Sequence, residues 1–113
     1  MRKQMIENAA YEVANQVRTV EDLIDNALTS IAELQARMVE VRAVSGTGVA
    51  TGQPAFEELG TALNALITAR GGMARCHAEL VDAKAKIPGL RTVGWGDGDD
   101  CPKAPSANLR VVA

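Results

Sequence analysis

A repeat of apolar residues every seven positions is the feature that most constrains the fold of this chain. Over residues 4–44 two such rows alternate at the four-and-three spacing of a coiled-coil stripe. The first row is Ile6, Val13, Val20, Ala27, Leu34 and Val41, and the second is Ala10, Val17, Ile24, Ile31 and Met38. The pattern predicts one long helix that packs an apolar stripe against another helix.

The same repeat continues over residues 54–87 and predicts a second helix. Its first row is Leu59, Leu66, Met73, Leu80 and Ile87, and its second row is Ala55, Ala62, Ala69, Cys76 and Ala83. The second row holds only small residues, and a large/small alternation lets two helix axes approach closely. We therefore expect Ala69 at a close contact between helices, and Cys76 in the core and unreactive.

Glycine and proline mark the limits of the two helices. Residues 45–53 are glycine-rich and read as a flexible connector, after which Pro54 suits a first helical turn. Pro88 and Gly89 end the second helix. Gly71-Gly72 conflicts with a helix, because each glycine costs about 1 kcal/mol relative to alanine in a helix interior. The heptad register continues across the pair, which favours a continuous helix over a break.

Composition and charge exclude several classes of protein. The 113 residues include one Phe, one Tyr and one Trp, so the core must be aliphatic and thin, which suits helix-on-helix packing. The net charge is -2 with no strongly basic stretch, so we expect no nucleic-acid partner. No apolar run is long enough to span a bilayer, so we expect no membrane partner. The predicted location is the cytoplasm, or a particle assembled there.

The predicted fold class is all-α: a long antiparallel helical hairpin with a coiled-coil-like seam. The hairpin occupies residues 1–89, and residues 90–113 form an irregular or partly β C-terminal arm. Both helices are apolar over more than a narrow seam, and wide stripes imply partner helices. We therefore expect self-association to complete the hairpin into a bundle.

The arm carries two short β-prone pieces, residues 90–93 and 109–112, on either side of a turn-rich segment. They could pair as a hairpin, add to another chain's sheet edge, or lie extended along the bundle. Trp95 is the sole tryptophan and a candidate anchor for an interface. The residues predicted to form interfaces are Ile24, Ile31, Leu34, Leu59, Leu66, Ala69, Met73, Leu80, Trp95, Leu109 and Val111.

No group of residues predicts a reaction. Cys76 and His77 are neighbours, but adjacent helical side chains point about 100° apart, and a thiol–imidazole dyad needs hydrogen-bond reach. His77 is the only histidine, and zinc takes three or four protein ligands. The run from Asp97 to Asp100 lacks the Glu that completes a calcium loop. We expect no catalytic residue, metal, cofactor or small-molecule substrate, and therefore no enzyme.

The function that this sequence favours is that of a structural subunit that self-associates through its helix stripes and assembles with another protein. A component of a bacteriophage or bacterial particle is one such role. The alternative is a small adaptor, inhibitor or secretion-type chaperone that offers its apolar stripe to a partner's helix.

Overall fold

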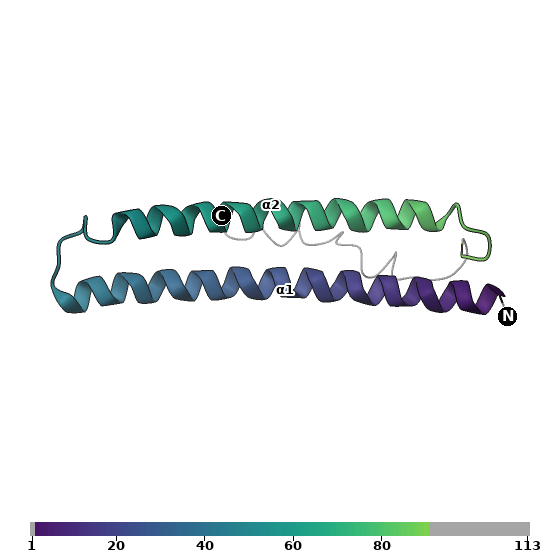
Figure 1. Cartoon of the computed structure of the whole chain (residues 1–113), viewed down its shortest axis with the longest axis horizontal. Coiled ribbons are helices and arrows are strands. Elements are labelled where there is room, and N and C mark those ends of the chain that lie inside the picture. Colours follow the sequence, from purple (N-terminus) through teal and green to yellow (C-terminus); the bar gives the residue numbers. More distant parts are fainter. Residues whose placement is uncertain (1, 91–113) are drawn as a thin grey trace, which may run out of the picture. The chain divides into compact units, whose positions relative to one another are not determined.

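The chain forms two long helices in a computed structural model that describes residues 2–90. Helix α1 spans Arg2–Ser45 and helix α2 spans Gln53–Lys84 (Figure 1). Within residues 2–90 there is no strand. The predicted all-α helical hairpin is confirmed, with α1 slightly longer and α2 ending earlier than the ranges 4–44 and 54–87. The predicted C-terminal arm lies outside the described residues except for Leu90, so its conformation stays a prediction.

Glycines with positive φ bound the connector between the helices. Gly46 has a φ of 74°, and its N–H donates to the carbonyl of Ala43 at 3.3 Å, which closes the last turn of α1. Gly52 has a φ of 83°, and its carbonyl accepts the N–H of Phe56 at 3.1 Å, the first hydrogen bond of α2. Both glycines occupy the left-handed region, where a Cβ is unfavourable. The connector therefore has a defined turn at each end.

The C-terminal end of α2 tightens before it stops. The N–H groups of Ala85, Lys86 and Ile87 donate to carbonyls three residues back, at 3.0–3.2 Å. This is the spacing of a 3₁₀ turn, which often follows the last turn of an α-helix. The regular helix thus ends at Lys84, although hydrogen-bonded turns continue to the predicted limit at residue 87.

Gly71 and Gly72 lie inside α2 and do not interrupt it. The predicted continuous helix is confirmed. Half-buried Leu66 and Met73 on either side keep the same seven-residue spacing, so the packing of this stripe offsets the low helix propensity of the two glycines.

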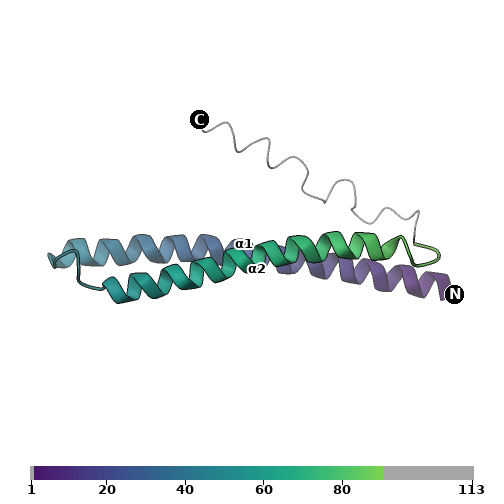
Figure 2. The same cartoon turned by 90° about the horizontal axis from the view of Figure 1, so that it is seen from above.

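The chain divides into two compact units, each of which contains part of both helices. Unit 1 is Met1–Val17 with Arg75–Ala113, and unit 2 is Arg18–Ala74. Unit 2 therefore holds the C-terminal part of α1, the connector and most of α2. Within each unit the two helical segments lie side by side in both views (Figures 1 and 2).

The buried side of α2 differs from the prediction in one of its two rows. In the predicted row Leu59, Leu66, Met73 and Leu80 are half-buried, as expected, whereas Ile87 lies beyond the end of α2 and is 39% exposed. The small residues are all exposed: Ala55, Ala62, Ala69, Cys76 and Ala83. Within one hairpin these residues therefore do not form the contact between α1 and α2, and the prediction that Cys76 lies in the core is wrong.

A bulkier row takes the place of the small one. Phe56, Leu63 and His77 are half-buried, and Lys84 in the same seven-residue row is only 6% exposed. Turning these larger side chains inward removes more apolar area from water than turning in alanine methyls would. The aliphatic stems of long cationic side chains contribute to this burial.

Unit 1 contains the most deeply buried hydrophobic residue among those described. Leu90 is 3% exposed, and its N–H donates to the carbonyl of Ile87 at 3.1 Å. Gly89 precedes it with a φ of 92°, a value that a residue with a Cβ rarely adopts. The turn at Gly89 thus directs Leu90 into the packing of unit 1.

Candidate interaction surface

Unit 2 carries an open groove next to the connector, with a volume of about 420 Å³. Its apolar lining comes from both helices, and its polar lining comes from the C-terminal part of α1 and from the connector. The lining residues are Leu34, Arg37, Met38, Val41, Arg42, Ser45, Thr47, Thr51, Gly52, Ala55 and Phe56. An apolar concavity with a few polar groups at its edge is the usual form of a site that binds another molecule.

Hydrogen bonds hold the connector beside this groove. Arg42 donates through Nη1 to the carbonyl of Thr47 at 3.1 Å. The Ser45 hydroxyl donates to the carbonyl of Arg42 at 3.0 Å and lies 3.1 Å from the Thr47 hydroxyl. These contacts satisfy carbonyls at the end of α1 and beyond it. Arg42 is therefore engaged in the fold, whereas Arg37 has no hydrogen-bond or ion-pair partner among residues 2–90.

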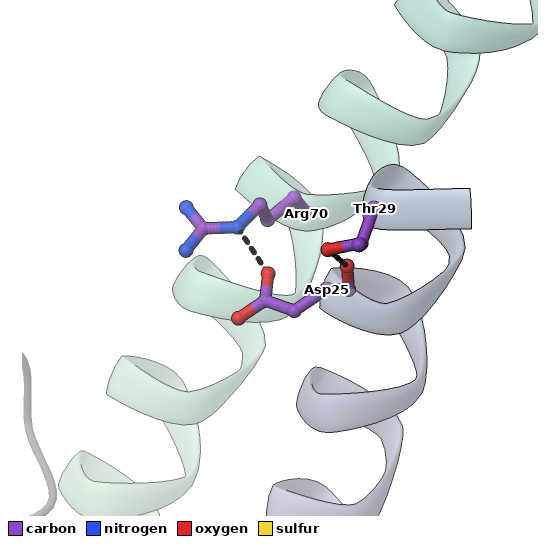
Figure 3. Close-up of polar contacts among 3 residues, drawn as sticks. All are labelled: Asp25, Thr29 and Arg70. Carbon is purple, nitrogen blue, oxygen red and sulfur yellow. Dashed lines mark hydrogen bonds and ion pairs between the residues drawn. The ribbon is translucent and has the colours of Figure 1, made fainter. Parts of the chain in front are cut away.

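An ion pair joins the two helices toward the end of unit 2 that is far from the connector. Arg70 of α2 donates through Nε to Oδ1 of Asp25 of α1 at 2.7 Å, and the two side chains point toward each other in Figure 3. The Thr29 hydroxyl donates to the carbonyl of Asp25 at 3.2 Å, one turn back along α1. The pair fixes which residues of the two helices lie at the same level.

The electrostatic environment of Arg70 is set by this contact. The hydrogen bond to Asp25, the charge of Asp25 and, to a smaller extent, the charge of Glu21 raise the pKa of the Arg70 guanidinium. The side chains of Arg70 and Asp25 are 61% and 53% exposed, so water screens their attraction. Exposed pairs of this kind contribute about 0.2–1 kcal/mol. The pair therefore acts on helix register more than on total stability.

Large hydrophobic side chains are widely exposed over the described residues. They are Met5, Tyr11, Val13, Leu23, Leu34, Val39, Val41, Val44, Val49, Ile67 and Ile87, with exposures of 39–82%. Leu90 is the one hydrophobic residue in residues 2–90 that counts as buried. Single exposed apolar residues are normal, but contiguous ones mark interaction surfaces.

The predicted interface residues fall into three groups. Those half-buried on the facing sides of the helices are Ile24, Ile31, Leu59, Leu66, Met73 and Leu80. Those exposed are Leu34 and Ala69. Trp95, Leu109 and Val111 lie outside the described residues. The half-buried residues of each helix lie on the side that packs against the other helix of the same chain, and Leu34 lines the groove.

Sequence reasoning missed the pairing of Asp25 with Arg70. Arg70 stands seven residues after Leu63 and seven before His77, in the bulky row of α2. This seven-residue spacing indicated that Arg70 lies on the side of α2 that faces α1. An apolar repeat does not include a charged residue, so the pattern of apolar residues alone did not reveal it. A long cationic side chain beside an apolar stripe can still reach a carboxylate on the neighbouring helix.

Residues 2–90 contain no cluster of three or more His, Cys, Asp or Glu side chains placed to hold a metal ion. Neither described helix has an apolar stretch long and uncharged enough to cross a bilayer.

Comparison of the chain with protein-family models, with curated proteins and with solved structures found no match.

Proposed function

We propose that this chain is a non-enzymatic structural subunit that self-associates through the apolar surfaces of its helical hairpin. One observation carries the proposal: large hydrophobic side chains exposed by 39–82% occur mostly along α1, with Ile67 as the member in α2, while Leu90 alone is buried among the hydrophobic residues of the described range. Covering a large apolar side chain stabilises by roughly 1.5–3 kcal/mol when burial is complete. A second copy of the chain supplies that cover without any further component.

Self-association of this kind suits a subunit of a larger assembly, with another protein as a further partner. A phage or bacterial particle built in the cytoplasm is the assembly that we propose. The support is the hydrophobic surface of the hairpin, because exposed apolar side chains on helices serve to pack against another protein.

Light scattering of the full chain over a range of micromolar concentrations tests the proposal. We expect a mass above that of one chain, rising with concentration. Replacing Leu23 and Val41 by Gln should lower that mass without loss of helix content, because both side chains project into solvent within the hairpin. Asn26→Gln is the matched control. A wild-type chain that stays monomeric throughout contradicts self-association.

The groove in unit 2 favours a second candidate, an adaptor, inhibitor or secretion-type chaperone that accepts a partner's helix. Leu34, Val41 and Phe56 provide an apolar lining from both helices. A helix laid in such a groove anchors through side chains on one of its faces. If the chain is monomeric and Phe56→Ala abolishes binding of a protein recovered from the source cell, the adaptor replaces the assembly subunit.

A further inference from the structure

One face of unit 2 is nearly free of charge. The hairpin of unit 2 has one face on each side of the contact between its helices, and the ion pair marks one of them. Asp25 comes directly after half-buried Ile24, and Arg70 comes three residues before half-buried Met73, so both side chains lie on the same side of the helix contact. Leu23 comes directly before Ile24 and Gly72 directly before Met73, so both lie about 100° round their helices toward the other side. We call that side the open face.

The open face of unit 2 is built from two rows on each helix. In α1 these rows are Val20, Leu23, Ala27, Ser30, Leu34, Arg37, Val41 and Val44, and in α2 they are Ala55, Glu58, Ala62, Ala65, Ala69 and Gly72. Val20, Ala27 and Gly72 are half-buried, and the other members are exposed. Arg37 and Glu58 are its charged members. The α1 half carries the large side chains and the α2 half carries alanines and a glycine, so a ridge lies beside a trough.

The ion pair also fixes the levels of the two helices. Arg37 comes twelve residues after Asp25, and Glu58 comes twelve residues before Arg70. Because both α-helices rise by 1.5 Å per residue, these two residues stand at one level. Leu23 and Gly72 share another level, two residues from the ion pair in the other direction. Ser30 and Ala65 share a third.

We propose that a second copy of the chain docks on the open face, with its two-fold axis parallel to the helices. This deepens the proposed function and rests on it. The two hairpins run in the same direction, and α1 of each copy lies on α2 of the other. The large side chains of α1 in each copy then pack against the small residues of α2 in the other copy. Large and small side chains on facing helices fit together in this way.

Charge complementarity selects this arrangement. Parallel hairpins keep residues of one level together, so Arg37 of each copy meets Glu58 of the other. Neither side chain has a hydrogen-bond or ion-pair partner among residues 2–90. At the next levels Ser30 meets Ala65, and Leu23, which is 60% exposed, meets Gly72. Reversing one hairpin would instead set ridge on ridge and leave both troughs empty.

Charge reversal in the full chain tests the contact. Sedimentation velocity gives the dissociation constant of the dimer for the wild type, Arg37→Glu and Glu58→Arg. Each reversal places two like-charged contacts in the dimer, so we expect the dissociation constant to rise about tenfold or more. Asp22→Lys, an exposed position on the far side of α1, should leave it unchanged. Circular dichroism verifies that each variant keeps its helix content.

Mixing the two reversed variants gives the decisive result. In a mixed dimer the glutamate introduced at position 37 of one copy meets the arginine introduced at position 58 of the other, and the native Arg37 and Glu58 meet in the second contact. The mixture should therefore dimerise more tightly than either variant does alone. Failure of the mixture to do so, or reversals without effect on a dimeric wild type, overturns this arrangement while self-association stands. A monomeric wild type overturns both proposals.

Discussion

Removal of the Asp25–Arg70 ion pair should cost little, and the cost should depend on salt. Two unit charges about 4 Å apart attract by about 1 kcal/mol in water, and the half-exposed side chains of this pair lie near that limit. Holding two side chains in one geometry offsets part of the gain. We therefore expect a coupling free energy of about 0.2–1 kcal/mol between the two residues.

A double-mutant cycle of Asp25→Asn, Arg70→Gln and the double variant measures this coupling. Urea unfolding at a fixed chain concentration keeps the contribution of association constant. In salt of about 1 M, where the screening length is about 3 Å, the coupling should fall toward zero. A coupling above about 2 kcal/mol, or one that salt does not change, would refute the interpretation of an exposed and screened pair.

Three further outcomes follow from burial. Leu90→Ala should lower the free energy of unfolding by about 2–3 kcal/mol in a denaturant titration, because Leu90 is 3% exposed, whereas Val44→Ala at 82% exposure should change it by less than about 0.5 kcal/mol. Cys76 should be alkylated by iodoacetamide in native buffer at a rate close to that of the unfolded chain, and strong protection would contradict its exposure. Ala69→Leu should leave helix content intact, because Ala69 is exposed, but should weaken self-association in sedimentation experiments, because Ala69 belongs to the open face. If the dimer is unchanged, the contact between copies lies elsewhere.

The helices could be predicted because their signals are local. Seven-residue spacing, Gly46 at one stop and Pro54 in a first turn each act within a few residues, and the structure places the helix limits close to them. Continuity across Gly71 and Gly72 followed from the preserved register. The early end of α2 at Lys84 did not follow, because its last hydrogen bonds change from four-residue to three-residue spacing.

The rotation of α2 could not be predicted from the apolar pattern. Rows on either side of Leu59 and Leu66 were both available for the helix contact, and an apolar repeat favours the alanine row, since Arg70, His77 and Lys84 interrupt the other. Long polar side chains can be half-buried while their charged ends reach water or a partner. The rotation of α2 depended on the larger apolar area that Phe56 and Leu63 bury compared with the alanines. How much area each row buries depends on the shape of α1 as well as on α2.

The groove and the ion pair of unit 2 differ in the length of chain between the residues that they bring together. Met38 and Phe56 line the same groove and are only eighteen residues apart in the sequence, whereas the paired residues Asp25 and Arg70 are forty-five apart. Closing the longer loop costs about 0.8 kcal/mol more entropy, and it follows easily once the shorter one has formed. The hairpin of unit 2 should therefore zip from its connector. Substitutions beside Gly46 and Gly52 would then slow folding, while loss of the ion pair would mainly speed unfolding.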